Sequence, residues 1–256
     1  RGRAVGSFGR AAFFSTEETK TISSTMGGMV VTNDPWLARR MEAFQSECTC
    51  PATSLVTRYL LKLALYHWLT EPRLHRYARA VYDVIGRRVG PLPRPTTPPE
   101  LRGLKPAIYA QRLSNGQAAV ALRQLRRLGR NVAHRRAVAD EVRARLEALG
   151  VTPPKAPAGA EPAFVRYPIW VENRAVAVRQ AASRAVLGTW FTSVLEEAAS
   201  PTCGEYVSGS CPRAEAAARH LVNLPTHPRV TGRDIAALVP ALVQAGASSP
   251  GAGRSC

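Results

Sequence analysis

The chain has 256 residues, 45% of them hydrophobic, which is enough for one large domain or two small ones. Its 35 Lys and Arg against 18 Asp and Glu give a net charge of +17. Its five cysteines lack the spacing of a zinc finger and are expected to be free thiols. The longest apolar run, residues 59–69, contains Lys62 and His67 and is too short to span a bilayer, so we expect a buried helix. No secretory leader is visible, and we expect a soluble, cytoplasmic protein without a membrane partner.

The basic charge alone would suggest nucleic-acid binding. The arginines, however, occur as pairs spread through amphipathic segments, without the pattern of a finger, an RRM or a basic zipper. Most of them are therefore interpreted as solvated helix faces. A basic nucleic-acid-binding protein remains an alternative, and a steep loss of DNA affinity with salt would support it.

The first predicted elements surround a lysine. Residues 11–34 are predicted to form a strand from Ala11 to Phe14, a turn, and a second strand from Gly28 to Thr32. A helix is expected from Pro35 to Phe44, after the Asn33-Asp34 cap.

Lys20 is the main candidate for chemistry. It follows Ser15 by five residues and precedes Gly27-Gly28 by seven, and only three other lysines occur in an arginine-rich chain. An amine can hold an aldehyde cofactor as a Schiff base, a serine hydroxyl can bind phosphate, and glycines allow close backbone approach. The alternative is an ordinary solvated lysine in a turn.

The middle of the chain is predicted to be helical. Residues 54–85 indicate one or two helices, and the proline-rich residues 90–99 indicate an extended linker. Apolar residues then recur every three or four positions and predict one long helix from Ser114 to Leu149, which Gly150 ends.

The last third alternates between strands and helices. Strands are predicted at 164–171, 189–194 and 221–224, and helices at 174–187, 212–220 and 231–243. The tail from Gly246 is small and polar and is predicted to be disordered.

Three segments, in order, resemble the DegT/DnrJ/StrS family of sugar aminotransferases. Residues 6–34 match its pattern of Ser, four residues, Lys, six residues and Gly-Gly. Residues 112–119, RLSNGQAA, resemble the Arg-Met-Ser-x-x-Gln-Ala-Ala segment that opens the family's long helix. Residues 223–231, NLPTHPRVT, resemble its Leu-Pro-x-His-Pro-x-Leu-Thr element.

This resemblance implies an α/β protein with the fold type I of pyridoxal 5'-phosphate (PLP) transferases. It implies that Lys20 is the Schiff-base lysine and that Ser15 binds the cofactor phosphate. Arg112, Ser114 and Trp190 are candidates for contact with the substrate or a second subunit, although Ser114 also suits a helix N-cap and Trp190 a core position. The implied partners are a nucleotide-linked keto-sugar, an amino-acid donor and a second copy in a homodimer. The family's dehydratases carry histidine at this lysine position, so Lys20 favours transamination.

The chain also departs from the family. Ala110 stands where members tend to carry an asparagine that reaches the neighbouring subunit's phosphate. The family's phosphate-binding Gly-Thr turn, its stacking aromatic ring and its ring-nitrogen aspartate lie upstream of the lysine segment. We therefore expect the C-terminal part of such an enzyme. Its expected divisions are residues 1–105, the remainder of a truncated large cofactor domain; 106–245, a long helix and small α/β domain; and 246–256, a flexible tail. A non-catalytic remnant or dimerisation module of the same fold is the other alternative.

Overall fold

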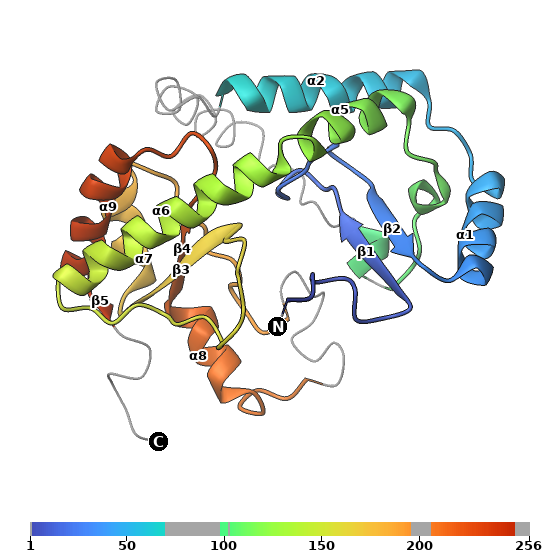
Figure 1. Cartoon of the computed structure of the whole chain (residues 1–256). Coiled ribbons are helices and arrows are strands. Elements are labelled where there is room, and N and C mark those ends of the chain that lie inside the picture. The colour runs from blue at the N-terminus through green and yellow to red at the C-terminus, as the bar shows by residue number, and fades with distance from the viewer. Residues whose placement is uncertain (1, 70–97, 102, 196–205, 249–256) are drawn as a thin grey trace. The chain divides into compact units, whose positions relative to one another are not determined.

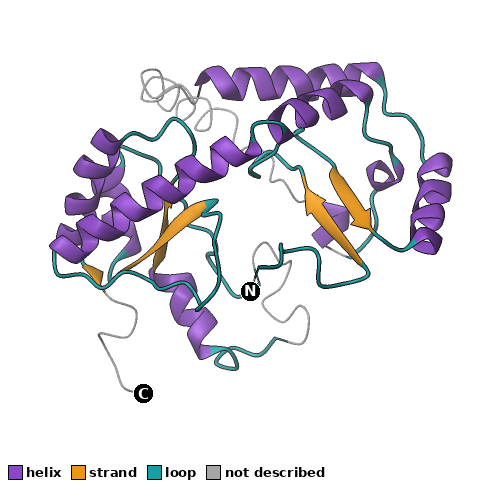
Figure 2. Cartoon of the chain, viewed as in Figure 1, coloured by secondary structure: helices purple, strands orange, loops and turns teal. Residues whose placement is uncertain are grey.

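The computed structural model describes residues 2–69, 98–101, 103–195 and 206–248 as a mixed α/β protein (Figures 1 and 2). Contacts divide these residues into two compact units. The N-terminal unit holds the described residues up to 69 together with 103–129, and the C-terminal unit holds 98–101 and the described residues from 130 onward. This division follows Gly129, whereas the sequence suggested a boundary at 105, because α5 (Asn115–Leu125) packs against α2 (Thr53–Leu69) of the first unit.

The N-terminal unit contains a two-stranded antiparallel sheet of β1 (Ala11–Ser15) and β2 (Gly28–Thr32). The register pairs Ala11 with Thr32 and Ser15 with Gly28. Both strands lie where the β-branched and aromatic residues predicted them, and the first is one residue longer. The connection between them carries Lys20.

Helix α1 (Pro35–Glu47) follows this sheet directly. The Asp34 carboxylate accepts hydrogen bonds from the N–H groups of Trp36, at 2.9 Å, and Leu37, at 3.1 Å, and Pro35 occupies the first turn. An acidic N-cap followed by proline starts a helix because it satisfies free N–H groups and presets φ. The expected start is confirmed, and the helix runs three residues beyond Phe44.

Helix α2 begins close to the expected residue 54 and contacts α5. A Cβ atom on Gly116 of α5 would lie 3.2 Å from Leu60 Cδ1 of α2, so the glycine permits close packing. The expected burial of residues 59–69 is wrong for one face, since Leu61 and Leu65 are exposed. The predicted helical residues 70–85 lie outside the described part of the chain. Of the expected linker, 90–97 also lie outside it, and Pro98–Leu101 forms the short helix α4.

The predicted long helix is two helices, α5 and α6 (Leu128–Ala148). They are separated by a turn at residues 126–127. Gly129, just after this turn, lowers helix propensity. The apolar residues after the turn belong to a different core, because Val142 and Leu146 are fully or almost fully buried in the C-terminal unit.

The C-terminal unit is built on a three-stranded antiparallel sheet in the order β4-β3-β5. The central strand β3 (Arg166–Val171) pairs with β4 (Leu221–Pro225) on one side and with β5 (Ala247–Ser248) on the other. Side chains alternate between buried and partly buried along β3 and β4, as expected for strands with one face against a core.

Helices α6, α7 (Arg174–Ala181) and α9 (Gly232–Gln244) supply the rest of this core. Helix α9 starts at a capping box, in which Thr231 and Asp234 satisfy each other's backbone N–H groups. Helix α8 (Pro212–His220) contacts β3 and has the bounds expected from the sequence. The side chains that α9 buries are Ile235, Leu238, Val239 and Leu242.

Three expectations for this unit are wrong in detail. Helix α7 ends at Ala181 rather than Leu187. The expected strand 189–194 is replaced by a single bridge between Gly188 and Asn223, and the Asn223 side chain donates to the Trp190 carbonyl at 2.6 Å. The Trp190 carbonyl thus accepts a hydrogen bond from a side chain. The predicted disorder of the tail is wrong for residues 246–248, because Ala247 is buried and pairs with β3, and residues 249–256 lie outside the described part of the chain.

Replacing Leu242 by alanine is expected to lower the free energy of unfolding by about 2–5 kcal/mol, because it leaves a cavity in a packed core. Leu242 is 0% exposed. Urea unfolding of residues 1–256 measures the change. The control is Leu149→Ala, at an exposed leucine after α6. Equal losses for both variants would show that this core does not hold the unit together.

Candidate functional site

Lys20 lies in the connection between β1 and β2, residues 16–27, which we call the lysine loop. Its side chain is partly exposed, and its backbone N–H donates to the Glu17 carbonyl at 3.0 Å. The Glu17 carboxylate accepts hydrogen bonds from the Thr19 N–H, at 3.0 Å, and hydroxyl, at 2.6 Å. Lys20 therefore projects from a short hydrogen-bonded turn that begins at the end of β1.

The lysine loop is closed at its base by buried polar groups. The Thr16 N–H donates to the Gly27 carbonyl at 3.0 Å, and the Ser24 N–H donates to the Thr16 carbonyl at 2.8 Å. The hydroxyls of Thr16 and Ser24 lie 2.7 Å apart, and both residues are fully buried. The backbone polar groups of a buried turn must find such partners.

Two glutamines of α5 hold the lysine loop from outside. Gln117 Nε2 donates to the carbonyls of Ser24, at 3.0 Å, and Met26, at 3.1 Å. Gln124 accepts from the Ser23 N–H at 3.0 Å and donates to the Ser23 carbonyl at 2.6 Å. These bonds join segments about a hundred residues apart along the chain, at separations of 91 to 101 residues.

The two glycines of the motif lie where a Cβ atom would come too close to a neighbouring atom. Gly27 has φ of +121°, and a Cβ atom there would lie 2.8 Å from Leu113 Cδ1. A Cβ atom on Gly28 would lie 2.9 Å from the Phe14 carbonyl oxygen across the sheet. Only glycine combines this backbone conformation with this approach. This geometry agrees with the close backbone approach that the glycines were expected to allow.

Ser15 ends β1 and is exposed. Its Oγ accepts a hydrogen bond of 3.3 Å from the Glu17 N–H. The described residues provide no acceptor for its hydroxyl proton. An exposed hydroxyl with a proton to donate suits an anionic oxygen.

The carboxylates of the loop and the adjoining turn are already engaged. Glu17 binds Thr19, and Glu18 forms an ion pair of 2.5 Å with Lys62 of α2. Asp34 caps α1, and the hydrogen bond from Arg10, with the Leu37 and Trp36 N–H groups, lowers the pKa of its carboxyl. Each of these three carboxylates thus already has a partner among the described residues.

Arg112 and Ser114 hold the segment that leads into α5. Arg112 Nε donates to the Cys48 carbonyl at 3.0 Å, and its Nη2 donates to the Ser46 carbonyl, both at the end of α1. A cation at a helix C-terminus satisfies the free carbonyls there. Ser114 is the N-cap of α5 and forms a capping box with Gln117.

Trp190 belongs to the C-terminal unit, where it stacks on Phe191 with ring centroids 5.1 Å apart. The Arg166 guanidinium lies over the Trp190 ring at 5.1 Å. The third motif also lies in this unit. The Thr226 hydroxyl donates to the Phe164 carbonyl at 2.6 Å and accepts from Arg135 at 2.9 Å, while His227 Nδ1 accepts from the Arg229 N–H at 3.4 Å. The motif thus ties the end of β4 to α6.

The sequence did not reveal the role of Ser23, Ser24 or the two glutamines. Gln117 is three residues after Ser114, and this spacing could have predicted the capping box. Its second role, binding the lysine loop, has no local signal.

None of the helices in the part of the chain that the structure describes is both long and apolar enough to span a lipid bilayer. Among the described residues, no group of three or more His, Cys, Asp or Glu side chains is arranged to hold a metal ion.

Known proteins resemble this chain in sequence and in structure. The sequence profile of the DegT/DnrJ/EryC1/StrS aminotransferase family matches residues 1–60 and 99–243. A curated relative, the L-glutamine:2-deoxy-scyllo-inosose aminotransferase of Streptomyces kanamyceticus, is 43% identical over 49 residues, which are 19% of this chain and 12% of the relative.

Among solved structures, a DegT/DnrJ/EryC1/StrS aminotransferase from Brucella abortus matches with a TM-score of 0.62 and 20% identity, over 93% of this chain and 52% of its own. DesI, determined in the presence of its TDP-sugar product, matches with a TM-score of 0.60 and 18% identity, over 94% of this chain and 50% of its own. The chain thus spans about half the length of these structures. Since the family profile covers more than half of the chain, the protein belongs to the DegT/DnrJ/EryC1/StrS aminotransferase family, whose members depend on PLP.

Proposed function

We propose that this chain carries the lysine-bearing part of the active site of a PLP-dependent aminotransferase, with Lys20 as the attachment point of the cofactor. The observation that carries the proposal is the geometry of the lysine loop in a chain that belongs to this family. Hydrogen bonds fix the loop, which carries the Lys20 amine, and the Ser15 hydroxyl lies immediately before it. The N-terminal unit is then a part of the large cofactor domain of fold type I, and the C-terminal unit is its small domain.

The residues present fit PLP in part. The Lys20 amine suits its aldehyde, and the Ser15 hydroxyl has a proton to donate to its phosphate. The carboxylates of Glu17, Glu18 and Asp34 already have partners. The resemblance to the family implies that the group that pairs with the ring nitrogen lies upstream of the lysine segment.

Each residue then has a defined task. Lys20 would hold the cofactor through its amine and would carry a proton to and from the reacting carbon of the substrate. Ser15 orients the phosphate, while Gln117 and Gln124 fix the loop so that the amine returns to the same place. When bound, PLP supplies the electron sink that stabilises negative charge at the substrate carbon.

The proposed substrates are a nucleotide-linked keto-sugar and an amino-acid donor, in deoxysugar or polysaccharide synthesis by a cytoplasmic homodimer. Family membership, the TDP-sugar in the DesI structure and the net charge of +17 support this choice. Trp190, with Arg166 over its ring, is the proposed substrate contact of the C-terminal unit. Arg112 and Ser114 are proposed to act through the position of α5.

The test compares the complete gene product with residues 1–256 alone, each mixed with PLP and then dialysed. We expect retained visible absorbance in the complete product and weak or no retention by residues 1–256, because the described residues supply only part of the cofactor's donor set. A stoichiometric complex of residues 1–256 would contradict the partial site. No binding by either protein would instead support a non-catalytic module of the same fold.

A further inference from the structure

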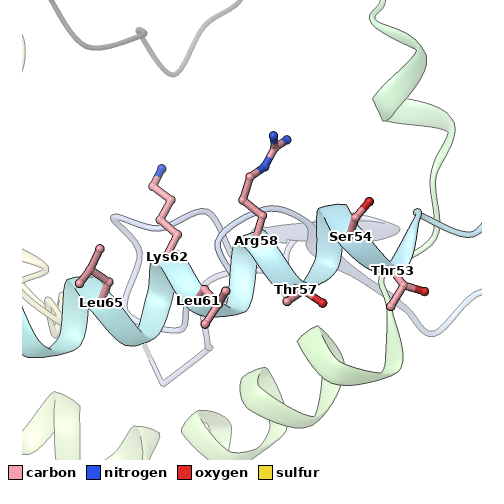
Figure 3. Close-up of a pocket in the computed structure, with 7 residues that line it drawn as sticks. All are labelled: Thr53, Ser54, Thr57, Arg58, Leu61, Lys62 and Leu65. Carbon is pink, nitrogen blue, oxygen red and sulfur yellow. The ribbon is translucent and has the colours of Figure 1, made fainter. Parts of the chain in front are cut away.

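Helix α2 presents an apolar surface on the side that lies away from α5. The exposed fractions of Leu61, Leu65 and Trp68 are 64%, 57% and 68%, at spacings of four and three residues. They share one face of the helix. With five neighbours they form what we call the outer face of α2. Seven of its eight residues line an open groove of about 740 Å³ (Figure 3). The eight residues are Thr53, Ser54, Thr57, Arg58, Leu61, Lys62, Leu65 and Trp68.

The fold of the N-terminal unit does not explain this apolar surface. The opposite side of α2 makes the packing contacts with α5 and the lysine loop: Val56 and Leu60 approach Gly116 of α5, and the Tyr59 carbonyl accepts from Thr25 at 3.1 Å. A helix that packs through one face ordinarily carries polar residues on the other. Exposed apolar surface of this kind marks a binding site.

The position of the outer face in the sequence separates it from the aminotransferase site. The family profile matches residues 1–60 and 99–243 and leaves out 61–98. Leu61, Leu65 and Trp68 all lie in this unmatched stretch. The sequence profile of the family therefore does not account for them.

The Lys and Arg side chains of α2 have no acidic counterpart within the helix, and residues 61–98 carry a net positive charge. Arg58 and Lys62 border the leucines, and α2 contains no Asp or Glu. Lys62 also pairs with Glu18, yet its side chain is 57% exposed. Residues 61–98 contain seven Lys and Arg against two Asp and Glu. If two copies of α2 packed together through this face, Arg58 and Lys62 of one helix would approach those of the other. Neither helix contains a carboxylate that could lie between them.

We propose that the outer face of α2 binds the surface of an anionic lipid bilayer. A helix that combines exposed Leu and Trp with neighbouring Lys and Arg lies in the interface, with its apolar side chains among the acyl chains and its cations at the headgroups. The occupant is then a membrane surface rather than a second copy of this chain.

Flotation of the complete gene product with vesicles tests the proposal. One set of vesicles contains phosphatidylcholine alone, and the other contains equal amounts of phosphatidylcholine and phosphatidylglycerol. We expect binding to the second set that falls with added salt, and little binding to the first. The double variant Arg58→Gln/Lys62→Gln is expected to bind roughly 30-fold more weakly. Leu61→Gln/Leu65→Gln is expected to bind at least about tenfold more weakly.

Matched controls come from α5 and the turn after it. Arg123→Gln/Arg127→Gln removes two exposed arginines at the same spacing, and Leu122→Gln/Leu125→Gln removes two exposed leucines. Both controls are expected to bind vesicles as the unchanged protein does. Circular dichroism verifies that each variant is folded.

Other outcomes overturn the proposal. Absence of binding to anionic vesicles does so directly, as does an equal loss in the control variants. If the protein ignores vesicles and the α2 variants dissociate a dimer, the outer face is an interface between two copies. If it ignores vesicles but an acidic protein binds through α2, the face is a protein-docking site.

Discussion

Replacing Lys20 by alanine in the complete gene product is expected to reduce transamination by about 10²–10⁴-fold, the contribution typical of a group that moves a proton in the transition state. The visible absorbance of bound PLP is expected to disappear, because no other amine lies in the lysine loop. Single-turnover formation of the amino sugar measures the rate. Lys20 is partly exposed and lies outside the core, so the variant is expected to fold.

Two variants separate this chemistry from charge. Lys20→Arg keeps the positive charge but cannot attach the cofactor, and it is expected to be as inactive as Lys20→Ala. Lys155→Ala removes an exposed lysine of the C-terminal unit and is expected to be fully active. An active Lys20→Arg enzyme would show that Lys20 serves only as a cation.

Replacing Gln117 by leucine is expected to release the lysine loop. The change keeps a similar volume but leaves the buried Ser24 carbonyl without its side-chain donor, whereas the Met26 carbonyl still accepts from the Ser24 hydroxyl. An unsatisfied buried group costs about 1–3 kcal/mol, so a loss of about 1–3 kcal/mol is expected. Urea unfolding measures this loss, and hydrogen exchange at the Thr16 and Ser24 amides reports the opening of the loop itself.

The control for this variant is Gln45→Leu, at an exposed position of α1. It is expected to change the free energy of unfolding by no more than about 0.5 kcal/mol. If Gln117→Leu leaves amide exchange in the loop unchanged, Gln117 does not hold the loop, and the Thr16–Ser24 bonds together with Gln124 are sufficient.

The elements with local signals could be predicted from the sequence. Strand β2 and helix α8 have the expected bounds, because a β-branched run after Gly-Gly and a helix between Pro212 and His220 are decided by neighbouring residues. Helix α1 was predicted to start where its Asp-Pro cap lies. Family membership could also be predicted, since three short motifs carry it in order.

What depends on distant contacts could not be predicted. The hydrogen bonds from Gln117 and Gln124 to the lysine loop join segments far apart in the chain, and hydrophobic periodicity does not predict them. The break between α5 and α6 separates apolar residues of two compact units, although their spacing along the chain is similar. The Asn223 side chain donates to the Trp190 carbonyl, a contact between residues 33 positions apart that no local pattern predicts.

The most direct test of the central claim is to identify the residue that holds the cofactor. The complete gene product is incubated with PLP, reduced with borohydride and digested, and the peptides are mapped by mass. We predict a single modified residue, Lys20, and no modification of Lys62, Lys105 or Lys155. An adduct on another lysine, or none at all, would contradict the assignment of Lys20 as the attachment point.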